Sequence, residues 1–249
     1  MEATLSTLLV SSDAPALAQA LAQRVVADAQ AAIGARGRFV LVLAGGSTPR
    51  AAYELLAQDP LRSAIDWTRV DVFFGDERCV PPSSDQSNFR MASETLLEHV
   101  PVPPGNIHRM LAEQEPHAAA VSYTETIAAV LGPTPRFDLV LLGLGPDAHT
   151  ASWFPHVALD EERWVDAPYV PKFATHRLTL TPPLINAARA IVVATSGAEK
   201  AEALAHVLSP TRDLAAYPAQ RLNPTSGTLT WLVDEAATAL LSSSSASVG

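Results

Sequence analysis

The feature of this 249-residue sequence that most constrains its fold is a repeated alternation of apolar, strand-like runs and helical segments. Runs such as "RFVLVLAGG" are continuous in β-branched and aliphatic residues, which is typical of strands covered on both faces. Segments with apolar residues at helical spacing lie between them, as in "DAPALAQALAQRVVADAQAAI". This order predicts an α/β fold with a mainly parallel, doubly wound (Rossmann-like) sheet and helices on both faces.

The predicted strands share apolar and β-branched composition and span residues 6–12, 38–46, 69–77, 136–145, 176–181, 188–197 and 227–234. The predicted helices share helical apolar spacing or Pro and Asp start signals and span residues 13–33, 48–58, 85–100, 115–131, 198–208 and 235–241. Residues 155–176 do not resemble a plain crossover and are predicted to form a small extra excursion or short strand. We expect residues 1–241 to form one domain and the Ser-rich residues 242–249 to be a flexible tail.

Composition narrows the class of protein. A hydrophobic share of 48% is typical of a globular chain, and a net charge of −9 argues against a nucleic-acid-binding surface. The single cysteine, Cys79, excludes an internal disulfide and any multi-Cys metal site. The first residues lack the pattern of a signal peptide, and no apolar run is long enough to span a membrane. We therefore expect a cytoplasmic protein.

Polar loops follow four of the predicted strands. They occupy residues 44–49, 75–78, 146–150 and 196–200. In parallel sheets the carboxyl ends of the strands meet at one edge, and ligands bind in the crevice beyond it. We therefore expect the four loops to converge on one site.

The first and last of these loops predict an anion site. Gly45, Gly46, Ser47 and Thr48 lead into a helix, whose N-terminus offers free N–H groups and hydroxyl donors to a phosphate. The alternative is an ordinary capped turn. Lys200 lies in a first helical turn, where a cation is unfavourable unless an anion binds nearby, although it could be a solvated surface lysine.

Arg78 and His149 each allow a functional and a structural interpretation. Arg78 could bind a phosphate or carboxylate, or pair locally with Asp76 or Glu77. His149 follows Asp147 by two residues, and a neutral imidazole held by a carboxylate is a suitable general base. The histidine spacing does not indicate a metal site, and no nucleophile-elbow motif is present.

Four motifs in order carry a resemblance that covers nearly the whole chain. They read "LAGGSTPR", "FFGDERCVPPSSDQSNFRMASETLL", "LLGLGPDAHTASWFP" and "RLTLTPPLINAARAIVVATSGAEKA". With these motifs the sequence resembles the 6-phosphogluconolactonases. The resemblance implies hydrolysis of 6-phospho-D-glucono-1,5-lactone to 6-phosphogluconate in the oxidative pentose phosphate pathway, with no metal or cofactor, by a monomer or homodimer.

The resemblance also implies roles for individual residues. His149 would be the base that activates water. On chemical grounds, either Asp147 or Asp76 could orient His149 or bind sugar hydroxyls, and the sequence leaves the choice between them open. Substrate and phosphate contacts would come from a larger set of residues: Gly45, Gly46, Ser47, Thr48, Arg78, Asn88, Thr150, Arg177 and Lys200. No partner other than the sugar-phosphate lactone is implied.

The sequence departs from the family pattern at two places. Ala148 stands where the family usually has Gly, and because the chain tolerates Ala there we expect right-handed or extended backbone. Prolines usually follow the family's Lys, but Phe173 and Ala174 follow Lys172 here, which leaves the role of Lys172 open.

Two other functions fit parts of the sequence. One is a glucosamine-6-phosphate deaminase, which has a related fold. In that family a Glu soon after the His orients the imidazole, whereas the matching stretch here, "TASWFP", contains no acid. A non-catalytic sugar-phosphate sensor is the other alternative, and no helix-turn-helix pattern precedes the first predicted strand. Acid release from the lactone, ammonia release from glucosamine 6-phosphate, or stoichiometric binding without turnover would distinguish the three.

Overall fold

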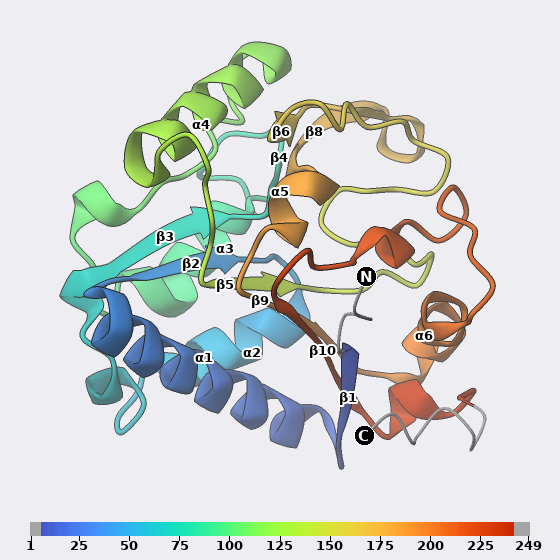
Figure 1. The fold of residues 1–249 in the computed structure, drawn as a ribbon, viewed down its shortest axis with the longest axis horizontal. Helices are drawn as coiled ribbons and strands as arrows, with labels where there is room; N and C mark the ends of the chain where they lie inside the picture. The colour runs from blue at the N-terminus through green and yellow to red at the C-terminus, as the bar shows by residue number, and fades with distance from the viewer. Residues whose placement is uncertain (1–5, 242–249) are drawn as a thin grey trace.

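A six-stranded sheet forms the centre of the computed structural model, which describes residues 6–241 (Figure 1). Every neighbouring pair of its strands is parallel. In spatial order the strands are β1 (Ser6–Ser11), β10 (Thr228–Asp234), β9 (Ala190–Thr195), β5 (Leu139–Leu142), β2 (Phe39–Leu43) and β3 (Val70–Phe74). The predicted parallel α/β sheet is therefore confirmed.

Helices pack on both faces of this sheet, as predicted (Figure 1). One face is covered by α1 (Ala14–Arg36), α2 (Ser47–Leu56) and α3 (Asn88–Ala92), which continues as a π-helical turn over Ser93–Leu97. The other face is covered by α4 (Pro116–Leu131), α5 (Pro182–Asn186) and α6 (Ala201–Leu208). Short 3₁₀ turns span Arg62–Ala64, Trp67–Arg69, Pro104–Asn106, Pro171–Phe173, Ala198–Lys200, Pro218–Arg221 and Ala236–Thr238.

Local sequence signals explain most helix boundaries. The Asp13 side chain accepts the N–H of Ala16 at 2.8 Å and caps α1. The helix runs through Gly34 and ends at Gly37, whose φ of 76° suits a residue without a Cβ. Two predicted helices were too long: α3 begins only after the Ser87 cap, and residues 235–241 hold just a 3₁₀ turn. The predicted tail, residues 242–249, lies outside the described part of the chain.

A second, antiparallel sheet lies beside the first. It contains β4 (Asp76–Arg78), β8 (Thr175–Leu180), β6 (Val165–Asp166) and β7 (Tyr169–Val170). The prediction of a single strand over residues 69–77 is wrong. Strand β3 ends at Phe74, the chain bends at Gly75, and Asp76 begins β4 in the second sheet. The predicted excursion in residues 155–176 is confirmed, since it holds β6 and β7.

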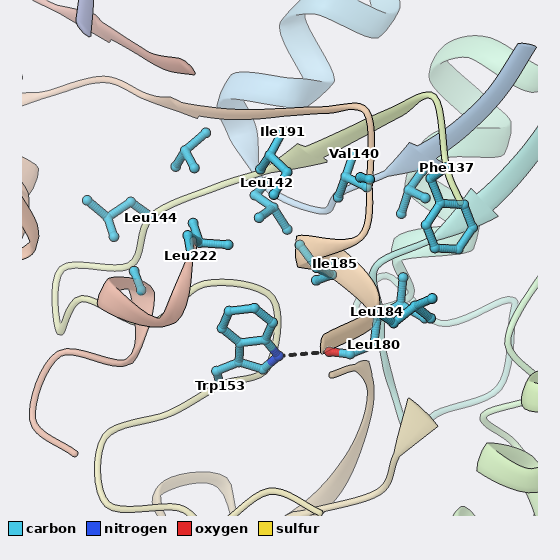
Figure 2. Close-up of a cluster of buried hydrophobic side chains, with 14 of the residues drawn as sticks. Phe137, Val140, Leu142, Leu144, Trp153, Leu180, Leu184, Ile185, Ile191 and Leu222 are labelled. Atoms are coloured by element: carbon cyan, nitrogen blue, oxygen red, sulfur yellow. Dashed lines mark hydrogen bonds between the residues drawn. The ribbon is translucent and has the colours of Figure 1, made fainter. Parts of the chain in front are cut away.

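The residues that connect β5 to this excursion are anchored in the core. Trp153 is 1% exposed and packs among buried side chains that include Leu180 and Ile185 (Figure 2). Its indole N–H donates to the carbonyl of Leu180 at 2.8 Å. Because an indole buried with a satisfied N–H is fixed at both ends, Trp153 holds the end of the loop after β5 in place.

The strand order reverses between β2 and β5. The chain leaves β2 for α2 on one face, whereas the segment after β5 packs on the opposite face. This reversal opens a crevice at the carboxyl ends of the two strands, where α/β proteins bind ligands.

Among the helices of residues 6–241, none has the length and hydropathy that a membrane crossing needs.

Candidate active site

A cavity of about 250 Å³ opens at the carboxyl ends of β2, β5 and β9. Its walls contain residues from all four predicted loops: Ala44–Pro49, Asp76, Arg78, Asn88, Gly143–Pro146, His149–Ala151, Ala194–Ser196, Glu199 and Lys200. The predicted convergence of the four loops is therefore confirmed. Most of the predicted site residues lie in these walls, while Asp147 and Arg177 lie just outside them.

The turn between β2 and α2 forms one end of the cavity. Gly46 has a φ of 107°, a conformation that favours glycine, and Ser47 begins the helix. The first N–H groups of a helix have no acceptor within it. Pro49 has no N–H and that of Arg50 donates to Gly46, so the N–H groups of Ser47 and Thr48 are the ones suited to bind an anion. Gly45 leaves room for Asn88, whose side-chain amide would overlap with any Cβ at that position.

Lys200 reaches the same end from the loop after β9. Gly197 has a φ of 102°, and its N–H donates to both carboxylate oxygens of Asp234 at 3.0 and 3.1 Å. The Oγ atoms of Ser196 and Thr48 lie 3.4 Å apart, which joins this loop to the α2 turn. Within residues 6–241, the Lys200 ammonium has no ion-pair partner, so its charge is available to a ligand.

Arg78 lies in the cavity wall and does not form the local ion pair that was the alternative interpretation. Its Nη1 donates instead to the carbonyl of Gln86 at 2.6 Å. Arg177 is paired with Arg78 across the β4–β8 ladder and is not part of the cavity lining. Burial and the adjacent Arg78 charge lower the pKa of Arg177, and among the described residues its Nε has no hydrogen-bond partner.

His149 lies at the other end of the cavity, with Asp147 beside it just outside the lining. The Nδ1 atom of His149 is hydrogen-bonded to Oδ1 of Asp147, and the imidazole stacks on Phe154 with ring centroids 4.5 Å apart. Gly145 makes this arrangement possible, because a Cβ there would overlap with the imidazole. A ring fixed on one edge and one face presents its remaining nitrogen, Nε2, in a defined direction.

The charge state of Asp147 sets the tautomer of that imidazole. Burial alone would raise the pKa of Asp147, but hydrogen bonds from His149 and Lys172 hold it well below its ordinary value. The carboxylate is therefore ionised and accepts a proton-bearing Nδ1. Neutral His149 then carries its lone pair on Nε2, which is the arrangement that a general base requires.

Asp76, the other carboxylate considered for orienting His149, makes different contacts. Its Oδ2 accepts the Ser152 hydroxyl at 2.7 Å, and its Oδ1 accepts the Asn88 amide at 3.2 Å. The geometry thus pairs Asp147 with the imidazole and leaves Asp76 in the cavity wall. Thr150 also lines the cavity. Its side chain is buried, and the Thr150 hydroxyl donates to the carbonyl of Gly143 at 2.8 Å.

Ala148 contradicts the expectation for its backbone. Its φ is 60°, in the left-handed region, so the prediction of right-handed or extended backbone was wrong. The conformation is imposed by hydrogen bonds on both sides: the Ala148 N–H donates to Gly145, and its carbonyl accepts the N–H of Ala219. Together these two bonds offset the strain of about 1–2 kcal/mol that a left-handed Ala carries.

Sequence reasoning gave no role to three residues that support the site: Glu77, Ser152 and Phe154. Glu77 is 3% exposed and accepts the N–H groups of Arg78, Asn88 and Phe89, which fixes the start of α3. Burial raises the pKa of Glu77, although those three N–H groups oppose the rise. Only the proximity of Ser152 and Phe154 to His149 in the sequence could have indicated their roles.

No cluster of three or more metal-ligating side chains occurs in residues 6–241.

Comparison with known proteins identifies the family to which this chain belongs. The family model described as glucosamine-6-phosphate isomerases/6-phosphogluconolactonase matches residues 12–231.

Two curated relatives and one solved structure resemble the chain over most of its length. The 6-phosphogluconolactonase of Synechocystis is 42% identical over 83% of this chain and 86% of its own length. That of Nostoc is 38% identical over 95% of this chain and 98% of its own. The structure of 6-phosphogluconolactonase from Trypanosoma cruzi has a TM-score of 0.84 at 26% identity and covers 96% of this chain and 98% of its own. The chain therefore belongs to the glucosamine-6-phosphate isomerase/6-phosphogluconolactonase family.

Proposed function

We propose that this chain hydrolyses 6-phospho-D-glucono-1,5-lactone to 6-phosphogluconate in the oxidative pentose phosphate pathway. One observation carries the proposal: a single cavity holds an anion cradle at one end and a carboxylate-bound imidazole at the other. The names of the relatives that are 38–42% identical support the same reaction.

The substrate's phosphate lies at the α2 end of the cavity in this proposal. The Lys200 ammonium and the Arg78 guanidinium neutralise its charge, while Ser47 and Thr48 donate hydrogen bonds. Gly46 lets the phosphate approach the backbone closely, while Gly45 leaves room for Asn88 beside it. Arg177, paired with Arg78 across the β4–β8 ladder and outside the cavity lining, adds its charge to the positive potential of this end.

The lactone carbonyl lies at the His149 end. Neutral His149 takes a proton from water through Nε2 as the water oxygen attacks C1 and the carbonyl becomes a tetrahedral oxyanion. Backbone N–H groups of the cavity wall stabilise that oxyanion. When the oxyanion collapses, the C1–O5 bond breaks and the imidazolium returns the proton to the departing ring oxygen. In this proposal the sugar hydroxyls bind Asn88, Thr150 and Asp76, which line the same cavity.

A glucosamine-6-phosphate deaminase is the second candidate, since the family contains both activities. The stretch that follows His149 contains no acid before Asp160, and the carboxylate bound to the imidazole is Asp147, which precedes it. This arrangement favours the lactonase. A non-catalytic sensor would not need an imidazole with a free, oriented Nε2.

Further parts of the proposal concern the whole protein. We propose that residues 1–241 act as one domain and that the protein is cytoplasmic, as a monomer or homodimer. The single-domain proposal is supported by the central sheet, which is shared by the two layers of buried side chains on its faces. The net charge of −9 supports a small-molecule substrate rather than nucleic acid.

The test is to incubate the protein separately with the phosphorylated lactone and with glucosamine 6-phosphate. Acid release above the spontaneous rate, without ammonia release, is the expected result. Ammonia release from the second substrate would establish the deaminase. Saturable binding without turnover of either substrate would establish the sensor.

A further inference from the structure

The His149–Asp147 pair is held by a third side chain, which comes from the second sheet. The Lys172 ammonium donates to Oδ2 of Asp147 at 2.9 Å, while Oδ1 of the same carboxylate binds the imidazole. Lys172 and Asp147 are 25 residues apart in sequence. Both oxygens of Asp147 are therefore occupied, one by the imidazole and one by the ammonium.

Aromatic contacts close this arrangement into a ring. Lys172 lies over the ring of Phe173 at 5.6 Å, and Phe173 meets Phe154 edge-on at 5.5 Å. Phe154 in turn stacks on His149. Starting from Asp147, a path of direct contacts thus runs through Lys172 and the two phenylalanines and returns to the imidazole.

The turn between β7 and β8 presents Lys172. Residues Pro171–Phe173 form a 3₁₀ turn, which Ala174 closes with a φ of 50° and an N–H bond to the Pro171 carbonyl. A proline at position 174 would have neither the φ nor the N–H that this turn uses. The turn in this chain therefore depends on a residue other than proline at that position.

We propose that Lys172 is a positioning residue for the reaction, because it fixes the Asp147 carboxylate in the orientation that directs Nε2 of His149 into the cavity. This inference rests on the proposed lactonase function. Stability alone is a poor explanation for the contact, since the Lys172 side chain is 57% exposed and exposed ion pairs contribute little to folding. Through this contact the excursion in residues 155–176 becomes part of the reaction end of the site.

The experiment compares Lys172→Met and Lys172→Arg with a matched control, Arg163→Met. Arg163 is also a cation of the excursion, is 53% exposed and pairs with Asp160 away from the cavity. We expect Lys172→Met to lower kcat about tenfold, because a slightly misdirected base loses rate steeply. We expect KM to stay within about twofold, since no phosphate contact changes, and Lys172→Arg to recover most of the lost rate by donating to the same oxygen.

The pH profile supplies a readout that a structural role would not change. Lys172 from the β7–β8 turn contacts the His149–Asp147 pair directly, and Arg177 from β8 lies over Phe173. The other charged groups that share the cavity with His149 are Asp76, Arg78, Glu199 and Lys200. Removing the positive charge of Lys172 favours the imidazolium, so the acid limb of kcat against pH should move to higher pH in Lys172→Met. Arg163→Met should keep the wild-type profile.

Each outcome has a distinct meaning. A wild-type protein that does not exceed spontaneous lactone hydrolysis refutes the proposed function itself. An active wild type with unchanged kcat and pH profile in Lys172→Met refutes the positioning role. So does an equal loss in Arg163→Met, or a rise of KM alone, which would make Lys172 a substrate contact. A lower kcat with a shifted acid limb and recovery by Arg supports it.

Discussion

The two ends of the cavity are built in opposite ways. At the α2 end, no side chain caps the helix, and the Lys200 ammonium forms no ion pair within residues 6–241. At the His149 end, the imidazole, Asp147 and Lys172 are already bonded to one another. The first end is complementary to an anion that the protein itself lacks, whereas the second end is organised before any ligand arrives.

This difference indicates how the two ends divide the work. An unpaired cation gains its interaction only when the phosphate binds, so the α2 end should determine affinity. A base that is held in one orientation gains nothing from ground-state binding but lowers the barrier to proton transfer. Substitutions at the two ends should therefore separate into effects on KM and effects on kcat, and each prediction below tests that separation.

The largest expected effect is that of His149→Asn. It should lower kcat by about 10²–10⁴, the usual contribution of a general base, and leave KM nearly unchanged. The measurement is lactone hydrolysis with the spontaneous rate subtracted. His156→Asn is a matched control, because His156 lies in the same segment with a φ of 58° that Asn adopts readily. A His149→Asn protein within threefold of the wild type would make His149 a bystander.

The next effect is that of Lys200→Ala at the opposite end. Losing a charge-assisted contact costs about 1.5–3 kcal/mol, which should raise KM about 10- to 150-fold. Folding should be little affected, since an exposed or half-buried Lys without a partner adds little stability. Arg50→Ala on α2, which breaks an exposed pair with Glu54, is the control. An unchanged KM, or a loss confined to kcat, would contradict the division between the ends.

A smaller effect concerns stability against pH. The pKa of Asp147 is lowered in the folded protein, so its ionisation stabilises the fold above the unfolded value, about pH 4, and that stabilisation is lost as the pH falls further. The melting temperature of the wild type should therefore exceed that of Asp147→Asn at neutral pH, and the gap should narrow below about pH 4. A gap that stays constant down to low pH would mean that Asp147 is not held in its ionised form.

The smallest effect is that of Ala148→Gly. Relief of left-handed strain favours Gly by about 1–2 kcal/mol, while loss of one buried methyl group opposes it by about 0.8 kcal/mol. The net result should be a melting temperature that rises by no more than about 4 °C. A clear fall in melting temperature would show that packing of the Ala148 methyl outweighs the strain of its backbone.

The sequence predicted what depends on short-range pattern. The loops at the ends of β2, β5 and β9 could be placed because buried strands and helix starts have local signals, and parallel strands align their ends. Lys172 could not be assigned, since its contact with Asp147 depends on how the second sheet packs against the first. Ala148 was predicted wrongly because its φ is set by a hydrogen bond from Ala219, which lies far away in the sequence.

The division between the two ends is tested most directly by a crystal structure of the His149→Asn protein with 6-phosphogluconate bound. The account predicts the phosphate within hydrogen-bond distance of Lys200, Arg78 and the first turn of α2. It also predicts the carboxylate of the product beside position 149, with Asp147 still bonded to Lys172. A phosphate bound at the position 149 end, or outside the cavity altogether, would contradict the account.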